Sequence, residues 1–537
     1  MNFSRRTGLL LVLAFTLSLP AVTPRIYAAD EVQYFSFLRS IWFDHDLSFD
    51  NEYRHFSEAA GPRLPGFRDT FLNDTTATGH RKTFATIGCA LLWAPFYAVA
   101  DAGVRLARTA GASVEADGYS RPYVAAVAYG SAVYGLLALL LSAYACALVF
   151  GRERQVPGRD AGRGGSGTRP SSARSRGARR PEDASRWIAV AAVWLGTPLL
   201  FYMYVAPPFA HAASAFAVAA FIVAWLRVRR TWSPGGMAAL GALAALMTMV
   251  REQDVFFVGG VAVDFAWSLI ERARERRGAR PIAAQLAAAA FGGAVALAAY
   301  LPQAIAYVVV NGGLRPSPLV TRKMTWTSPH AWQVVASPEH GLLFWTPLAG
   351  LAIAGLILMA MDGVTVVRKF GGPAGASGGI GAGAGGHKPA RDGTGPNAGG
   401  PATATGGATT GRRIAICLLV MVALQVYVNG VIESWMVAGA FGQRRFVGLT
   451  AILVVGLAAL LNGLDRVASR RVAVAAMVLA AWWNVALIVQ FGTGLMDRQH
   501  LTLGTNLYNA FVVVPREIPR IVYRYAFDRN SFYAAPR

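Results

Sequence analysis

Two pairs of ionisable residues in the sequence have the chemistry to act on one substrate. Asp30 and Glu31 follow directly after an apolar run over residues 7–28, and Arg444 and Arg445 come directly before another apolar run. A carboxylate at a membrane boundary is costly to desolvate and tends to have a function. The guanidinium fork of arginine matches the oxygens of a phosphate group. The two pairs are therefore typical of a general base and a phosphate ligand at a membrane surface.

Each pair also has a structural interpretation. The acidic pair could lie in the first turn of a helix, where negative charge favours the helix dipole. The basic pair could extend toward lipid head groups. We favour Asp30 as the catalytic base with Glu31 beside it, and Arg444 or Arg445 as the leading phosphate ligand.

Other polar residues between the apolar runs are weaker candidates for the same site. Arg251 and His340 are further candidates for binding a phosphate, although Arg251 is followed by acidic residues and could form a local ion pair. Tyr34, His80 and Lys82 are candidate contacts to an acceptor or within the loop that carries them.

One segment could bind a metal ion. Asp44 and Asp46 supply carboxylate oxygens of the kind that bind a divalent cation such as Mg or Mn. A polar surface turn is the alternative, because paired aspartates are common in loops. The cysteines at 89, 146 and 417 lie far apart in apolar stretches and indicate neither a disulfide framework nor a metal site.

The composition indicates a membrane protein. The 537 residues are 54% hydrophobic and only 15% charged, yet the formal net charge is +22. A soluble domain has about 25% charged residues, so this chain is not an ordinary soluble enzyme. A nucleic-acid binder would carry its basic charge on a polar domain. A membrane protein with several spans and arginine-rich loops accounts for both properties.

The fold class that we predict is all-α, a polytopic membrane helix bundle of about 11 spans with a long first extracytoplasmic loop. A span needs about 20 mostly apolar residues. The runs that meet this description are 7–28, 122–150, 187–206, 209–226, 236–250, 254–270, 282–310, 342–362, 413–431, 446–464 and 472–491.

The basic segments predict the orientation, because cytoplasmic loops are rich in arginine and lysine. Segments 151–186, 227–230, 271–280 and 466–471 lie on one side if the apolar run 84–102 is not a span. We therefore expect 84–102 to be an interfacial helix on the outer face. The first span is expected to be an uncleaved signal anchor rather than a cleaved signal peptide, and Arg444 and Arg445 then lie outside, against the usual bias.

The chain divides into six parts by this interpretation. They are the first span, outer loop and second span (1–150), a disordered basic cytoplasmic linker (151–186), a membrane bundle (187–362), a Gly/Ala-rich disordered cytoplasmic linker (363–412), a C-terminal membrane bundle (413–491) and an extracytoplasmic tail (492–537).

In their order and placement these features resemble the GT-C superfamily of integral-membrane glycosyltransferases, especially the dolichyl-phosphate mannosyltransferase and aminoarabinose transferase type. The resemblance covers most of the chain outside the linkers and the tail. It rests on Asp30-Glu31 with Tyr34 after the first span, Gly88 to Pro95, Asp44 to Tyr53, His340 to Leu343 with Thr346-Pro347, and Gly439 to Arg445. The chain departs from the family at Val32, where a proline often stands, and at His80 to Thr83, where the family has a His-Pro-Pro motif.

The resemblance implies that Asp30 acts as the catalytic base. The expected reaction is inverting transfer of a sugar from a polyprenyl-phosphate donor to a lipid, glycan or protein acceptor outside the cytoplasm. The enzyme would lie in a bacterial inner (cytoplasmic) membrane among its lipids, with the active site facing outward and no nucleic-acid partner. The alternatives are a multi-span transporter or lipid flippase, and a non-catalytic assembly protein.

Overall fold

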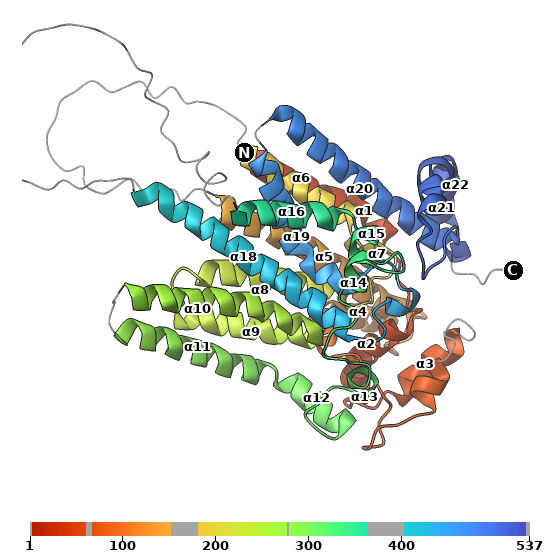
Figure 1. The fold of residues 1–537 in the computed structure, drawn as a ribbon. Helices are drawn as coiled ribbons and strands as arrows, with labels where there is room; N and C mark the ends of the chain where they lie inside the picture. Colours follow the sequence, from red (N-terminus) through yellow and green to blue (C-terminus); the bar gives the residue numbers. More distant parts are fainter. Residues whose placement is uncertain are drawn as a thin grey trace, which may run out of the picture.

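The structure is a computed structural model that describes residues 3–60, 67–151, 181–275, 279–361, 402–464 and 466–532. These residues form helices and loops, and the β-structure among them is limited to isolated bridges. The helices pack side by side as an elongated bundle (Figure 1). The all-α prediction is confirmed.

Eight helices are long and apolar enough to cross a membrane. They are α4 (Gly88–Thr109), α5 (Arg121–Phe150), α8 (His211–Val228), α10 (Val258–Arg274) with the short helix η5 (Glu252–Phe257) before it, α11 (Ala279–Ala299), α18 (Ala402–Val431), α19 (Thr450–Gly463) with η7 (Arg444–Leu449) before it, and α20 (Val467–Thr493). Shorter apolar helices lie beside them, among them α1 (Phe3–Ser18) and α9 (Pro234–Val250). The length and composition of these helices are those of an integral-membrane protein. The count of about 11 spans stays a prediction.

Prolines divide three of the predicted spans into two helices each. A proline inside a helix removes a backbone hydrogen bond and crowds the preceding turn. The divided pairs are α6 (Pro181–Gly196) and α7 (Leu199–Tyr204) at Pro198, α11 and α12 (Leu301–Asn311) at Pro302, and α15 (Leu342–Trp345) and α16 (Leu348–Met361) at Pro347.

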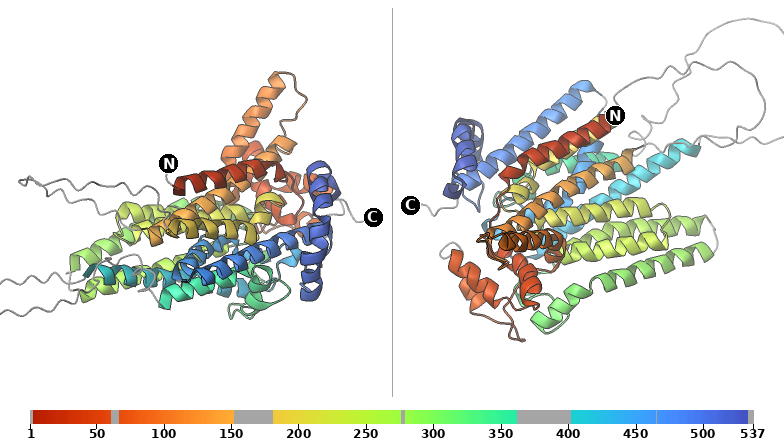
Figure 2. Two further views of the ribbon diagram at one scale, coloured as in Figure 1. Left: turned by 90° about the horizontal axis from the view of Figure 1, so that it is seen from above. Right: turned by 180° about the vertical axis from the view of Figure 1, so that it is seen from behind.

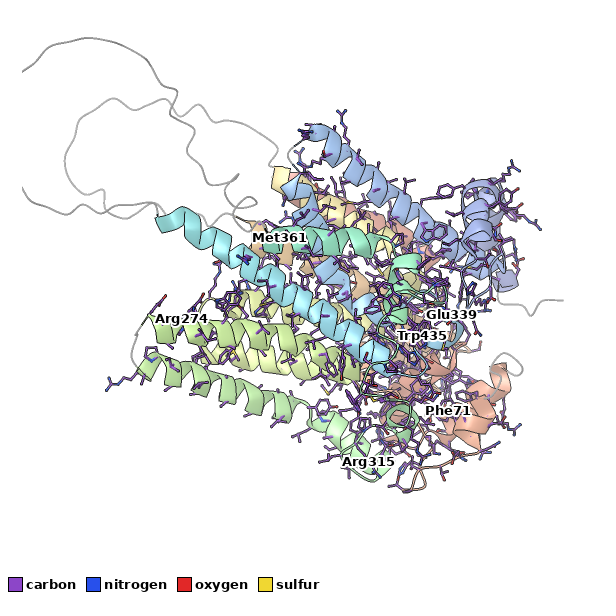
Figure 3. The ribbon with its side chains drawn as sticks, in the orientation of Figure 1. Phe71, Arg274, Arg315, Glu339, Met361 and Trp435 are labelled. Atoms are coloured by element: carbon purple, nitrogen blue, oxygen red, sulfur yellow. The ribbon has the colours of Figure 1, made fainter. Side chains whose placement is uncertain are left out.

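The bundle has two chemically different ends. Arg274 and Met361 lie at one end, and Phe71, Arg315, Glu339 and Trp435 lie at the other (Figure 3). We call these the basic end and the loop end. The basic segments at 227–230, 271–275 and 466–471 all belong to helix ends or connections at the basic end, as the orientation prediction requires. The side of the membrane that each end faces stays a prediction.

The first long loop forms a helical layer at the loop end. It contains α2 (Ala29–Arg39), the π-helix η2 (Ser40–Asp44), α3 (Asp50–Ala60), the π-helix η4 (Arg68–Leu72) and α4. The orange α4 projects from the bundle at a steep angle to the other helices (Figure 2). The prediction that this helix lies along the membrane surface stays a prediction, because α4 is also long and apolar enough to cross a membrane.

The tail closes over the loop end. It forms α21 (Leu503–Tyr508), the π-helix η8 (Asn509–Val513), α22 (Val514–Phe527) and η9 (Arg529–Phe532). The Tyr525 hydroxyl donates to the carbonyl of Ala21 at 2.6 Å. The Arg529 guanidinium donates to the carbonyls of Val22 at 2.9 Å and Pro20 at 2.7 Å. The tail therefore holds the segment that leads from α1 into α2.

The predicted linkers lie mostly outside the described residues. Two helices nevertheless begin inside the predicted boundaries, because α6 starts at Pro181 within 151–186 and α18 starts at Ala402 within 363–412. The threonines and glycines at the start of α18 are weak helix formers. This part of α18 continues from the strongly apolar part of the same helix, which packs in the bundle.

Close helix crossings at glycines hold the centre of the bundle. A Cβ atom on Gly355 of α16 would come within 2.0 Å of the carbonyl oxygen of Gly456 on α19. Small residues of this kind let two backbones approach closely in a membrane. The crossing fixes α19, which is almost completely buried and carries η7 at its loop end.

This crossing can be tested with two matched substitutions in α16. We expect Gly355→Ala to destabilise the protein by about 1–3 kcal/mol, because the added methyl group must push α16 away from α19. Gly350→Ala in the same helix is the control, because its Cβ meets only the side chain of Leu343 at an ordinary 3.5 Å. Thermal unfolding of both variants in one detergent gives the comparison, and equal melting temperatures would contradict the close crossing.

Candidate active site

The structure brings one residue of each predicted pair into contact. The Arg444 guanidinium donates to the carboxylate of Asp30 at 2.6 Å, across 414 residues of sequence. Asp30 lies in the first turn of α2, and Arg444 begins η7. Their side chains remain 24% and 15% exposed, so the contact lies at a protected surface rather than in the core. The guanidinium also lies over the ring of Phe209 at 5.3 Å, which limits its movement.

Two further arginines meet beside this contact. Gln253 connects them, because its Oε1 accepts from Arg251 at 3.2 Å and its Nε2 donates to the backbone carbonyl of Arg445 at 3.1 Å. Arg445 also donates from Nη2 to the Ser434 hydroxyl at 3.3 Å. The Nη1 atoms of Arg251 and Arg445 are buried without a hydrogen-bond partner among the described residues. Such unsatisfied cationic donors are costly unless an anion or another acceptor binds them.

Two further buried polar side chains, Asp254 and His211, lie near the arginines. Asp254 is fully buried, and one of its oxygens accepts from the Ser214 hydroxyl at 2.6 Å while the other has no partner. His211 is buried against the ring of Tyr202 at 4.3 Å, and both of its ring nitrogens lack partners. We refer to Arg251, Arg444 and Arg445 as the arginine cluster.

Glu31 does not join the arginine cluster but begins α2. Its Oε2 accepts from the backbone N–H groups of Tyr27 at 2.8 Å and Ala28 at 3.0 Å. The side chain is fully buried, and this burial raises the pKa of Glu31 to about 8, although the two backbone donors oppose the shift. In this geometry Glu31 is a cap that fixes the direction of the helix carrying Asp30, rather than a group that reaches a substrate.

Tyr34 lies one turn beyond Asp30 on the same face of α2, where residues four apart are neighbours. Burial raises the pKa of its hydroxyl, and the charges that act on it include those of Arg251 and Arg444. The structure therefore places Tyr34 beside the arginine cluster as a neutral hydroxyl.

The predicted role of His340 as a phosphate donor is not what the structure shows. Its Nε2 donates to the carbonyl of Ala440 at 2.9 Å, and its ring stacks on Trp345 at 4.7 Å. Burial lowers the pKa of His340 to about 4, so the ring is neutral and its single N–H is already used. His340 instead holds the segment that leads to Arg444. The motif did not predict this role, because the partner of His340 is the carbonyl of Ala440, 100 residues away in the sequence.

His80 and Lys82 interact with their own loop. His80 Nδ1 lies 3.1 Å from the Thr78 hydroxyl, and Lys82 forms an ion pair with Asp74. The Thr78 hydroxyl in turn donates to the carbonyl of Val310 at 2.7 Å, which fastens the loop to α12. The described contacts of both residues are thus local and structural, and acceptor contacts from them stay a prediction.

Asp44 and Asp46 are already engaged within the first loop. Asp44 forms an ion pair with Arg39 and accepts from the Asn51 amide at 2.7 Å. Asp46 accepts from the Ser40 hydroxyl at 2.7 Å. Among the described residues, three or more His, Cys, Asp or Glu side chains do not gather anywhere in a way that could hold a metal ion. The geometry favours the polar turn over the metal site at this position.

A second buried charge cluster lies toward the basic end. The Asp264 carboxylate accepts from Arg229 at 2.8 Å and also pairs with Arg413, which reaches Glu271 at 2.6 Å. Asp264 is fully buried, and the indole of Trp225 completes its contacts at 2.8 Å. Because these charges satisfy one another, they connect α8, α10 and α18 and leave no open site.

No family model, no curated protein and no solved structure matched this chain. The candidate site therefore rests on the sequence motifs and on the geometry described above.

The buried cap predicts a specific dependence of stability on pH. Because folding raises the pKa of Glu31 to about 8, its contribution to stability is complete at acidic pH and is lost as the pH rises through that value. Glu31→Gln is expected to reduce the loss of folding stability between pH 5 and pH 9, because the amide stays neutral over this range. Denaturation midpoints measured across this range test the effect. Glu58→Gln is the control, because Glu58 is exposed in α3. This variant should lose stability with rising pH as the unmodified protein does.

Proposed function

We propose that this protein is a membrane glycosyltransferase of the GT-C type that moves a sugar from a polyprenyl-phosphate donor to an acceptor outside the cytoplasm. The observation that carries the proposal is the contact between Asp30 and Arg444 beside two buried guanidinium nitrogens without partners. A carboxylate and an unsatisfied cationic cluster at one end of a membrane bundle are the groups that such a transfer requires.

The arginine cluster suits the phosphate of a lipid-linked donor. A phosphate supplies several acceptor oxygens, and the free Nη1 atoms of Arg251 and Arg445 supply donors for them. During transfer the bond between the anomeric carbon and the phosphate oxygen breaks, and negative charge develops on the leaving phosphate. Fixed guanidinium groups in a water-poor site stabilise that charge. A lipid phosphate therefore leaves without needing a proton.

Asp30 accepts the proton of the acceptor hydroxyl. The hydroxyl oxygen attacks the anomeric carbon from the face opposite the phosphate, so the configuration inverts. In the structure Arg444 occupies one oxygen of Asp30. A donor phosphate competes for the same guanidinium, and when it does so the carboxylate is released to accept from the acceptor hydroxyl. Donor binding thus prepares the base, and positioned general bases contribute about 10²–10⁴-fold to such steps.

A lipid flippase is the rival that also needs a cationic site for a phosphate. Membranes from cells that lack the protein separate the two functions. Loss of a transferase leaves the donor to accumulate on the outer side, whereas loss of a flippase leaves the donor on the cytoplasmic side. Polar residues along the whole path through the bundle would favour the flippase. The unpaired guanidinium nitrogens of Arg251 and Arg445, however, both lie at the loop end.

Asp30→Asn tests the base directly. We expect sugar transfer to fall about 100-fold or more, because the amide accepts no proton, while the amount of protein in the membrane is unchanged. Asp69→Asn, an exposed substitution in the same loop, is the control and should keep full transfer. Full transfer by Asp30→Asn would remove this residue from the mechanism.

Arg445→Gln tests the arginine cluster. Binding of a short-chain polyprenyl phosphate to the purified protein is expected to weaken roughly tenfold or more, because one charged hydrogen-bonding group is lost. Binding of the corresponding polyprenol, which has no phosphate, should not change. Arg54→Gln is the control, since Arg54 lies exposed in α3. An equal loss of both ligands in Arg445→Gln would indicate a packing defect rather than a phosphate contact.

A further inference from the structure

The tail helices lie across the bundle at the loop end and cover only part of their own apolar surface. The dark-blue α21 and α22 cross the direction of the long helices (Figures 1 and 2). One side of the tail packs on the protein, since Val514 is buried and Tyr525 and Arg529 bind the carbonyls at 20–22. On the other side, large apolar side chains are 38% to 78% exposed. They include Leu503, Leu507, Phe511, Ile518, Val522 and Phe527.

The exposed apolar residues of the tail form a stripe rather than scattered positions. Leu503 and Leu507 are four residues apart in α21, and Ile518 and Val522 are four apart in α22, so each pair lies on one helix face. Pro515, which is also exposed, extends the second pair by one turn. Single exposed apolar residues are common on protein surfaces, whereas a contiguous stripe marks contact with another apolar surface.

The contact between the tail and α20 indicates the depth at which this stripe lies. α20 is apolar enough to cross a membrane, and its 27 residues make it about 40 Å long. Trp482 lies about 22 Å from the start of α20, and any ~30 Å hydrocarbon stretch along the helix contains that point. The Trp482 indole donates to the carbonyl of Ala510 in η8 at 3.1 Å. The exposed ring of Phe511, next to Ala510, is therefore at the depth of lipid rather than of water.

A row of arginines runs along α22 beside the apolar stripe. Arg516, Arg520 and Arg524 are spaced four residues apart and share one helix face. Arg516 and Arg520 are exposed, and the contact of Arg520 with Glu517 is loose at 3.7 Å. Three arginines against one glutamate leave α22 with a net positive charge. A helix with an apolar face and cations beside it is typical of a membrane interface, where the guanidinium groups reach the lipid head groups.

We propose that α21, η8 and α22 form a binding surface for anionic phospholipid, with the apolar stripe among the acyl chains and Arg516 and Arg520 on the phosphate groups. The positive charge of α22 complements a negatively charged lipid surface. Because Tyr525 and Arg529 also bind the segment that leads into α2, the lipid-bound tail restrains that segment from the membrane side. The inference goes beyond the proposed sugar transfer and does not depend on it.

The test measures contact between the tail and lipid in the full-length protein. The protein is placed in lipid nanodiscs with a nitrobenzoxadiazole fluorophore on one added cysteine, while the native cysteines are buried. Val522→Cys carries the fluorophore in the stripe, and Glu58→Cys in the exposed part of α3 is the control. We expect doxyl-labelled lipid to quench the fluorophore at position 522, and more strongly when phosphatidylglycerol is mixed into phosphatidylcholine. The fluorophore of Glu58→Cys should stay unquenched in both.

The charge requirement is tested by removing two arginines from α22. In Arg516→Gln with Arg520→Gln, the increase in quenching that phosphatidylglycerol causes should fall roughly twofold or more, because two cations near the lipid surface are lost. Arg54→Gln with Arg68→Gln removes the same charge from exposed positions in α3 and η4, and should keep the full increase. If the α22 variant fails to fold, added salt should weaken the same increase in the otherwise unmodified protein.

The outcomes separate anionic lipid from the other possible neighbours of the stripe. Quenching that rises with phosphatidylglycerol, and that falls with salt or with loss of the two arginines, supports the proposal. Equal quenching with and without phosphatidylglycerol overturns it. A fluorophore that doxyl-labelled lipid does not quench also overturns it, and indicates a protein neighbour such as a second copy if soluble iodide fails to quench as well. These results stand whether or not Asp30→Asn abolishes sugar transfer.

Discussion

The buried positive charge of the arginine cluster is the constraint around which the loop end is organised. Removing a guanidinium group from water costs several kcal/mol unless opposite charge and hydrogen bonds compensate it. The protein compensates Arg444 with Asp30, while Arg251 and Arg445 each retain a buried nitrogen without a partner. The same contact joins the first turn of α2 to η7 and so determines the relative position of two distant segments. The described contacts therefore leave two buried guanidinium donors of this cluster unsatisfied.

The bundle supplies the rigidity that such a balance needs. The glycine crossing between α16 and α19 fixes the helix that follows η7, and the ring of Phe209 restrains Arg444 from the start of α8. Glu31 and the tail restrain α2 from the opposite side, through backbone groups at 20–22 and 27–28. The proline breaks separate α6 from α7, α11 from α12 and α15 from α16. The arginine cluster is thus held by elements that are themselves packed, as a preorganised electrostatic site requires.

The sequence predicted the helical class, the apolar segments and the residues that form the central contact, because hydrophobic runs and boundary charges are local signals. It also contained the signals for features that were missed. Pro198, Pro302 and Pro347 mark the broken spans, and the three-residue spacing from Ala28 to Glu31 is that of a helix cap. The role of His340 could not be predicted, because its partner is a backbone carbonyl 100 residues away.

Contacts between residues far apart in the sequence impose an order on how the protein is assembled. The carboxylate of Asp30 is synthesised before its cationic partner Arg444, which follows 414 residues later. Arg529, whose guanidinium donates to the carbonyls of Pro20 and Val22, is synthesised later still. During synthesis the helical layer that contains α2 must therefore form before Arg444 and Arg529 can contact it. The layer that carries Asp30 is therefore synthesised well before the two contacts that hold it in place can form.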